Sequence, residues 1–314
     1  MTDVRKHTAT RWHQRGLNNA LIVGATYYGV SYLPGWLTHG IGYVGTWVAY
    51  HLMREGRLGV LQNLAVMFPE KSDRQRRSLA LRTYRSYARD VIDFIRSLHL
   101  TPDQTRRLVA RMDTSALDQA MAEGNGAIIL SGHFGNWELG GVLMSRLTSF
   151  NLSVVARAEP SESVTKLRET LRAKVGVRTI EVRRYLETAM VIRSRLRNNE
   201  VIAMLMDRHL GKDHVDVSFF GRSTPFLRTP ALLASLSRAP LVPCFVFREG
   251  KGFSVVCGPL IRVAGGDDDE NGVRTAIQAI ATIIEGHVRK NPEMWYQFYP
   301  YWSSGVVSEG EPSR

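Results

Sequence analysis

Residues 127–147, AIILSGHFGNWELGGVLMSRL, contain the clearest indication of the fold class of this protein. It opens with an apolar run over residues 127–130, which predicts a short buried strand. The turn-forming residues SGHFGNW follow, and apolar positions from Leu139 to Leu147 then mark one face of a helix. A strand, a tight turn and a helix in this order are typical of α/β proteins, which bind ligands at the carboxyl ends of their strands. We therefore expect His133 at such a strand end.

The remaining sequence repeats this alternation of strands and helices. The predicted strands cover residues 127–130, 152–156, 201–206, 215–220, 240–248 and 253–257. The predicted helices cover residues 137–147, 163–175, 185–198, 229–237 and 271–290, and residues 55–123 are expected to be helical throughout. Short connections between alternating elements predict an α/β domain with a mostly parallel sheet flanked by helices.

The chain is strongly basic. Its 314 residues carry a formal net charge of +12, which suggests a polyanionic neighbour such as nucleic acid, an anionic membrane or a phosphorylated substrate. The arginines are not interleaved with exposed aromatic residues and no recognition motif is present, which argues against nucleic acid. Cys244 and Cys257 lie in apolar, strand-like sequence, and we expect two buried thiols.

The N-terminal region has a different composition. No Asp, Glu, Lys or Arg occurs between Gly16 and Met53, and Pro34 divides this stretch into halves shorter than a membrane span of about 20 residues. Its many tyrosines and tryptophans suit the headgroup level of a membrane, and basic residues precede it. We expect a membrane-associating helical pair in residues 1–54, although two core helices or one true span are alternatives. A domain over residues 55–303 and a disordered tail over residues 304–314 would follow.

The turn after the first strand contains candidate catalytic groups. His133 and Glu138 would diverge by about 140° on one helix, but they can meet if His133 lies in the loop. The pair could then act as a general base with its orienting acid, while the alternative is a structural histidine with a capping glutamate. Asp207 follows the strand over residues 201–206 and could contact His133 from a neighbouring strand end. Backbone N–H groups near Gly135 and Asn136 are candidate oxyanion donors.

Several further side chains are expected at the same edge of the sheet. Arg157 follows a strand, Arg168 and Arg172 lie on the next helix, and Arg208 follows Asp207. Arginine can clamp a phosphate or polarise a carbonyl, so these four residues, together with Asn136, are predicted to bind substrate.

Neither a metal nor a cofactor is expected. A metal site could in principle use Asp207, His209, Asp213 and His214, but their irregular spacing argues against it. No G-x-S-x-G elbow, P-loop or G-x-G-x-x-G motif is present. The chemistry is therefore predicted to come from histidine, carboxylate and arginine.

HFGNWE resembles the His-x4-Asp/Glu motif of glycerolipid acyltransferases. More narrowly, the chain resembles the lipid A late acyltransferases, which are lauroyl and myristoyl transferases, and their mycobacterial relative, the phosphatidylinositol mannoside acyltransferase. The segments that carry the resemblance are QNLAVMFPE, VVAR, VIAMLMDRHL, VDVSFFG and NPEMWYQFYPYW. The resemblance as a whole runs from about residue 15 to residue 303.

The resemblance implies an enzyme that transfers an acyl chain from acyl-carrier protein or coenzyme A to a hydroxyl of a membrane glycolipid. It implies that His133 is the general base, Glu138 its partner, Asp207 a second acid and Arg172, or else Arg168, a functional arginine. In the mycobacterial branch, the acid that contacts the histidine is at the position of Asp207. Whether Glu138 or Asp207 orients His133 is open at this level.

The same resemblance implies a location at the cytoplasmic face of the inner (plasma) membrane. A lipid A precursor is one possible acceptor, and a phosphatidylinositol mannoside or another phosphoglycolipid is the alternative. An acyl-thioester hydrolase is the nearest enzymatic rival, and a non-catalytic membrane scaffold is a further one.

Overall fold

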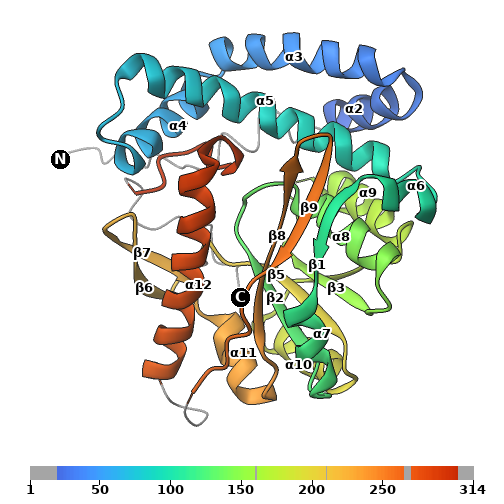
Figure 1. The fold of residues 1–314 in the computed structure, drawn as a ribbon, viewed down its shortest axis with the longest axis vertical. Helices are drawn as coiled ribbons and strands as arrows, with labels where there is room; N and C mark the ends of the chain where they lie inside the picture. The colour runs from blue at the N-terminus through green and yellow to red at the C-terminus, as the bar shows by residue number, and fades with distance from the viewer. Residues whose placement is uncertain (1–19, 160, 210, 265–269, 303–314) are drawn as a thin grey trace, which may run out of the picture.

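The computed structural model describes residues 20–159, 161–209, 211–264 and 270–302 (Figure 1). The helices are α2 (Ala20–Tyr32), α3 (Gly35–Leu52), α4 (Arg54–Met67), α5 (Asp73–Ser97), α6 (Pro102–Arg107), α7 (Ser115–Ala122), α8 (Trp137–Leu147), α9 (Glu162–Ala173), α10 (Tyr185–Arg197), α11 (Thr229–Ser237) and α12 (Glu270–Lys290). The strands are β1 (Val109–Asp113), β2 (Ala127–Ser131), β3 (Leu152–Ala156), β4 (Arg178–Glu181), β5 (Val201–Leu205), β6 (His214–Phe219), β7 (Arg222–Leu227), β8 (Leu241–Glu249) and β9 (Gly252–Cys257).

A seven-stranded sheet with the order β1-β9-β8-β2-β5-β3-β4 forms the centre of the fold. The pairs β2–β8, β2–β5, β3–β5, β3–β4 and β1–β9 are parallel, and β8–β9 is antiparallel. β2 therefore lies in the middle of the sheet, and all five of its residues are buried. The prediction of an α/β fold with a mostly parallel sheet is confirmed.

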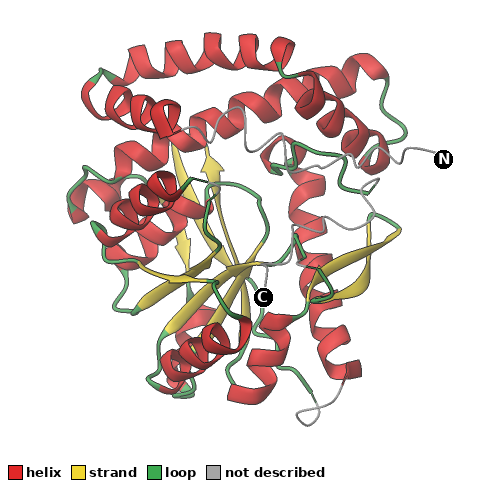
Figure 2. Ribbon diagram, turned by 180° about the vertical axis from the view of Figure 1, so that it is seen from behind, coloured by secondary structure: helices red, strands yellow, loops and turns green. Residues whose placement is uncertain are grey.

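Helices cover both faces of this sheet (Figure 2). Side chains alternate along β2, so that Ile128 and Leu130 pack into one part of the core and Ala127 and Ile129 into the other. The first part contains apolar residues of α10, α11 and α12, and the second contains those of α7, α8 and α9. The catalytic candidates His133 and Asp207 follow β2 and β5. Because parallel strands end at the same edge of a sheet, these residues lie close together.

The N-terminal helices form a layer at one end of the molecule, where α3 extends across α5 (Figure 1). Many of their large apolar side chains face outward; Tyr32 is 81% exposed and Trp36 is 77% exposed. In the described part of the chain, no helix combines the length and the apolar content that a membrane crossing requires. The predicted division at residue 54 stays a prediction, and the basic residues before Gly16 and the predicted tail over residues 304–314 lie outside the described residues.

Three short strands differ from the sequence-based expectation. β1 interrupts the region predicted to be helical over residues 55–123, because its backbone pairs with β9 from far along the chain. β4 has only four residues, and β7 contains Pro225, so neither carries a strong strand pattern. The predicted strand over residues 215–220 is β6, which pairs with β7 in a separate antiparallel hairpin.

The expectation of two buried thiols is wrong. Cys244 and Cys257 lie directly opposite each other in the antiparallel register of β8 and β9 and form a disulfide. Because the pairing register of two strands is a tertiary property, the apolar sequence around each cysteine predicts burial but not this bond.

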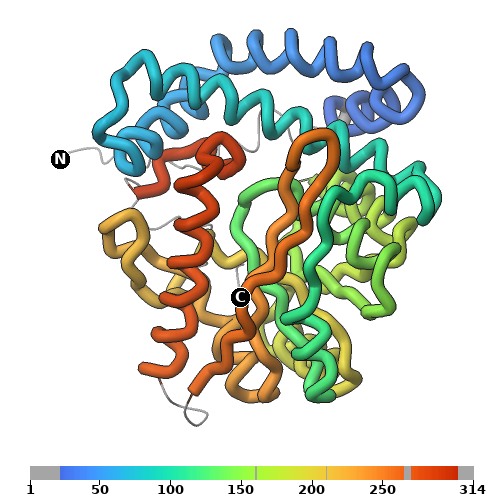
Figure 3. Tube along the Cα trace, viewed as in Figure 1, coloured from blue at the N-terminus to red at the C-terminus, as the bar shows by residue number. Residues whose placement is uncertain are grey.

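The segment after α12 returns along α4 and α5 (Figure 3). Asn63 of α4 holds it there, since its side-chain nitrogen donates to the carbonyl oxygens of Gln297 at 3.0 Å and Tyr299 at 2.8 Å. Its side-chain oxygen accepts from the Tyr301 backbone N–H at 2.8 Å. Gly59, one helical turn earlier, leaves room for this segment, because a Cβ atom there would lie 2.6 Å from the Cα atom of Tyr299.

We predict that Gly59→Ala lowers the melting temperature, although alanine is the better helix former by about 1 kcal/mol. The backbone of Tyr299 cannot yield as a side-chain end could, so the returning segment must move. Gly45→Ala on α3 is the matched control, because nothing lies within 4 Å of its added Cβ atom. Calorimetry on both variants checks this, and an equal melting temperature for the two would contradict the proposed close approach.

Candidate active site

His133 lies in the loop between β2 and α8, as the sequence predicts. Gly135 gives this loop its shape: its φ is +63°, and a Cβ atom there would lie 2.2 Å from the carbonyl oxygen of Val246. Only glycine allows this approach and this backbone conformation. The His133 side chain is 18% exposed, so it is partly covered but remains reachable from the solvent side.

Asp207 contacts His133 directly. β5 pairs with β2 in parallel register up to Leu205 and Ser131, so the residues after both strands meet at one edge. The His133 ring atom Nδ1 lies 2.7 Å from Asp207 Oδ1, and the His133 backbone N–H donates to Oδ2 at 2.9 Å. Asp207 is fully buried. Between the two acids that the sequence left open, Asp207 is the one that orients the ring.

The Asp207 carboxylate accepts two further hydrogen bonds from the returning C-terminal segment. Trp295 donates through Nε1 at 3.0 Å and Gln297 through Nε2 at 2.8 Å, both to Oδ2. Burial alone raises the pKa of Asp207, but the neighbouring His133 and the hydrogen bonds from it outweigh this and hold the pKa at about 2. The ionised carboxylate can only accept, which assigns the Nδ1 proton to a neutral His133 and leaves Nε2 as the basic atom.

The pKa of His133 lies below its usual value. Burial is the main cause, since it disfavours the charged imidazolium, and the positive charge of Arg208 acts in the same direction. The Asp207 carboxylate opposes both effects without overcoming them. His133 is therefore neutral at pH 7, in the protonation state that a general base needs.

Glu138 has a different partner from the one proposed for it. It lies in the first turn of α8, but its carboxylate forms a two-fold pair with Arg172 of α9, at 2.5 Å from Nη2 and 3.1 Å from Nε. Burial favours the neutral acid, yet the attraction and hydrogen bonds of Arg172 keep the pKa of Glu138 below its usual value. The expected contact of Glu138 with His133 is thus replaced by a strong link between α8 and α9, because Arg172 reaches both carboxylate oxygens.

The backbone amides of Gly135 and Asn136, which are predicted oxyanion donors, already have hydrogen-bond partners within the protein. The Gly135 N–H donates to the carbonyl of Met294 at 2.9 Å, and the Asn136 N–H donates to that of Val246 at 2.7 Å. The same tight loop that exposes His133 thus pairs these amides with neighbouring segments. The amides of Trp137 and Glu138 are the remaining donor candidates in the first turn of α8.

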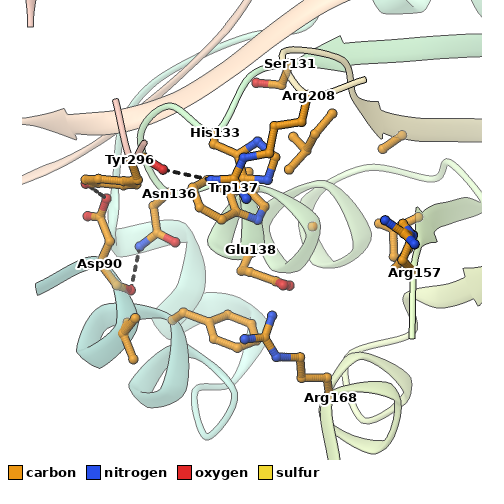
Figure 4. Close-up of a pocket in the computed structure, with 18 of the residues that line it drawn as sticks. Asp90, Ser131, His133, Asn136, Trp137, Glu138, Arg157, Arg168, Arg208 and Tyr296 are labelled. Carbon is orange, nitrogen blue, oxygen red and sulfur yellow. Dashed lines mark hydrogen bonds between the residues drawn. The ribbon is translucent and has the colours of Figure 1, made fainter. Parts of the chain in front are cut away.

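Asn136 caps α8 and also lines the cavity at His133, and its predicted binding of substrate stays a prediction. Its side-chain oxygen accepts from the Leu139 N–H at 3.1 Å, and its side-chain nitrogen donates to the Asp90 carbonyl at 2.9 Å. The Asp90 carboxylate in turn accepts from the Tyr296 hydroxyl at 2.5 Å, and burial is the main cause that raises its pKa to about 7. Figure 4 shows this group on one side of His133 and Arg157 on the other.

A cavity of about 2010 Å³ opens at His133. Its lining comes from both faces of the sheet, with Ile129 and Val154 on the α8 side and Met204 and Leu232 on the other. Ligand pockets for small molecules are typically about 300–1,000 Å³. The size and the apolar lining therefore suit a larger, lipid-like ligand.

The four predicted arginines all line this cavity. Arg172 pairs with Glu138, and Arg168 lies 3.1 Å from Glu159. Arg208 donates to the Gln297 side chain and to the Tyr296 carbonyl, each at 2.9 Å. The binding of substrate by these four arginines stays a prediction.

The alternative metal site receives no support. Within the described ranges, no group of three or more histidine, cysteine or acidic residues is placed to hold a metal ion. The Asp213 carboxylate instead accepts hydrogen bonds from the N–H and the hydroxyl of Thr229. The rings of His209 and His214 pack edge to face, with 4.9 Å between their centroids.

Sequence reasoning from the residues missed the part that the C-terminal segment plays in the site. Trp295 and Gln297 bond to Asp207, and the Tyr296 N–H donates to the His133 carbonyl at 2.8 Å. The only signal was the aromatic run NPEMWYQFYPYW, which supported a family resemblance without indicating a contact.

A family model for bacterial lipid A biosynthesis acyltransferases matches residues 8–304. The chain belongs to this family. The match includes β2, β5, the His133 loop and all of the described C-terminal segment, so every residue of the site lies inside it.

Phosphatidylinositol mannoside acyltransferases are among the relatives of this family member. The protein from Mycobacterium tuberculosis (strain ATCC 25618 / H37Rv) is 30% identical over 202 residues, which cover 63% of this chain and 61% of the relative. The protein from Mycolicibacterium smegmatis is 28% identical over 209 residues, covering 65% of this chain and 66% of the relative. The aligned part of the chain thus spans about two thirds or less of the length of these proteins.

We predict that Asp207→Asn lowers the pKa of His133 further, because it removes the one neighbouring charge that favours the imidazolium. An NMR titration of the His133 ring in both proteins measures this. Asp216 is exposed on β6, so Asp216→Asn is the control and should leave the midpoint of the His133 titration unchanged. A midpoint that rises in Asp207→Asn would contradict the assigned pair.

Proposed function

We propose that this family member transfers a fatty acyl group from a thioester of acyl-carrier protein or coenzyme A to a hydroxyl of a membrane phosphoglycolipid. The observation that carries the proposal is the buried Asp207–His133 pair at the mouth of a large apolar cavity. The relatives favour an acceptor like phosphatidylinositol mannoside over a lipid A precursor. The contact between Asp207 and His133 favours the same branch, in which an acid at this position is expected to touch the histidine.

The proposed reaction is a direct transfer. Nε2 of His133 takes the proton of the acceptor hydroxyl while the hydroxyl oxygen attacks the thioester carbonyl carbon. The carbon–sulfur bond then breaks, and the thiolate receives the proton from the imidazolium, so that an ester and a free thiol leave. Asp207 stabilises the imidazolium that forms in between.

The remaining polar groups have supporting parts in this scheme. N–H groups in the first turn of α8 would stabilise the negative charge that develops on the carbonyl oxygen. The Glu138–Arg172 pair holds α8 against α9 and so fixes the direction of that first turn. Arg157, Arg168 and Arg208 add positive charge to a cavity that would receive a phosphorylated headgroup or carrier.

We predict that His133→Ala lowers the rate of acyl transfer by about 10²–10⁴-fold, which is the usual contribution of a general base. Mass spectrometry of acylated acceptor, formed from an acyl-coenzyme A and a phosphatidylinositol mannoside, measures it. Asp216→Asn, at an exposed position of β6, is the control and should transfer at the wild-type rate. A folded His133→Ala protein with wild-type transfer would refute the base assignment, and free fatty acid formed without acceptor would instead indicate a thioester hydrolase.

We further propose that α2 and α3 lie at the surface of an anionic membrane. Their outward-facing apolar side chains include Tyr32, Trp36 and Trp47, and several residues of both helices also line the cavity. A lipid acceptor could thus pass from the bilayer to His133 along a continuous apolar surface. That this bilayer is the inner membrane, approached from its cytoplasmic face, stays a prediction.

We predict that the double change Trp36→Ser and Trp47→Ser weakens binding to phosphatidylglycerol vesicles, because two large apolar anchors are lost. Raising the salt concentration should weaken wild-type binding as well, since salt screens the attraction of a chain of net charge +12. Vesicle flotation measures both effects. Tyr185→Ser, an exposed aromatic of α10, is the control, and equal losses in the two variants would argue against α2 and α3 as the contact.

A further inference from the structure

We infer that Gln297 is a positioning residue, which keeps the Asp207 carboxylate aimed at His133 and separated from the Arg208 guanidinium. The Gln297 side chain lies between the two charges. Its Nε2 donates to Asp207 Oδ2 at 2.8 Å, and its Oε1 accepts from Arg208 Nε at 2.9 Å. The inference rests on the proposed function only where it concerns the rate of acyl transfer.

The orientation of the Gln297 amide follows from its two neighbours. The ionised carboxylate of Asp207 can only accept hydrogen bonds, and the guanidinium of Arg208 can only donate them. A reversed amide would place its oxygen against the carboxylate and its NH2 group against the guanidinium. Gln297 is 1% exposed, so water cannot relieve either repulsion, and one orientation is fixed.

The contact of Gln297 with both Asp207 and Arg208 determines which groups form hydrogen bonds with the Asp207 carboxylate oxygens. Oδ2 receives the His133 backbone N–H, Trp295 and Gln297, while Oδ1 receives the His133 ring. Arg208 is held by Gln297 and by the carbonyl of Tyr296, so its charge acts on the pair from nearby without occupying Oδ1. Without the amide, the guanidinium would be free to move onto the carboxylate and compete with the ring.

The charged and titratable groups around the pair come from several elements. Arg208 follows β5, Tyr299 and Tyr301 belong to the C-terminal segment, and the Tyr301 hydroxyl donates to the Asp207 carbonyl at 2.6 Å. Glu138 on α8 is neutralised by Arg172 on α9. The Asp90 carboxylate on α5 accepts a hydrogen bond from the Tyr296 hydroxyl, and the Tyr296 backbone N–H in turn donates to the His133 carbonyl. Gln297 is the neutral side chain that joins Asp207 to the Arg208 guanidinium.

The test is Gln297→Glu, which keeps the size of the side chain and the acceptor for Arg208 but replaces the donor to Asp207. A second carboxylate at this position should raise the pKa of His133, so the acidic limb of the profile of kcat against pH moves upward by about one unit. We expect kcat at neutral pH to fall roughly 10-fold, because a hydrogen bond to a charged group is lost. A purely structural residue would tolerate this change, since the new carboxylate pairs with Arg208.

Asn63→Leu is the matched control. Asn63 holds the same C-terminal segment at three backbone groups without touching Asp207, so its loss should lower the melting temperature and leave the acidic limb in place. If Gln297→Glu folds poorly, Gln297→Met offers a neutral side chain of similar shape that removes both bonds, with the same expected fall in kcat. An acidic limb and a kcat that match the wild type in folded Gln297 variants would overturn the inference.

An NMR titration of the His133 ring separates this inference from the proposed reaction, because it requires no substrate. A lowered midpoint in the neutral variant Gln297→Met, in which Arg208 is free to compete for the Asp207 carboxylate, supports the positioning role even if the protein transfers no acyl chain. An unchanged midpoint in folded Gln297→Met overturns that role even if acyl transfer is observed.

Discussion

Burial of the negative charge of Asp207 is the constraint on which the rest of the site depends. A carboxylate without exposure to water is tolerated only when its oxygens are fully hydrogen-bonded, since the uncompensated charge would cost several kcal/mol. The donors come from the His133 loop and from the C-terminal segment, which are far apart in the sequence. The charge can therefore be stabilised only after the sheet edge, the loop and the returning segment have come together. Folding of the chain and assembly of the Asp207–His133 pair are thus one event.

The two acids of the site have separate tasks because they have separate neighbours. Asp207 sits beside a histidine and orients it, whereas Glu138 sits beside an arginine and joins two helices. Both carboxylates are ionised, but only the first can influence the basicity of His133 through direct contact. The resulting arrangement combines one neutral base with a rigid surrounding of paired charges. Rigidity of this kind is what a direct transfer between two bound molecules requires.

The apolar surfaces of the molecule are consistent with this chemistry. The cavity at His133 reaches both faces of the sheet, and residues of α2 and α3 line part of it while their other side chains face outward. A soluble substrate would require neither feature. A lipid acceptor and an acyl chain would use both, since each must leave an apolar environment without being exposed to water. The membership of the chain in the lipid A biosynthesis acyltransferase family agrees with this physical reading.

The amino-acid sequence alone was enough to predict the strand, turn and helix over residues 127–147, the mostly parallel sheet, and the presence of His133 and Asp207 at one edge. These features follow from local apolar patterns and from the rule that parallel strands end together. The folded structure was needed to identify the partner of Glu138, the disulfide between Cys244 and Cys257, and the bonds of Gln297 to Asp207 and Arg208. The hydrogen bonds of Glu138 and Asp207 depend on which donor reaches which carboxylate oxygen, and the partners are separated by 34 residues in one case and 90 in the other. Local apolar patterns can bring two strand ends to one edge, but they do not specify which side chains bond there.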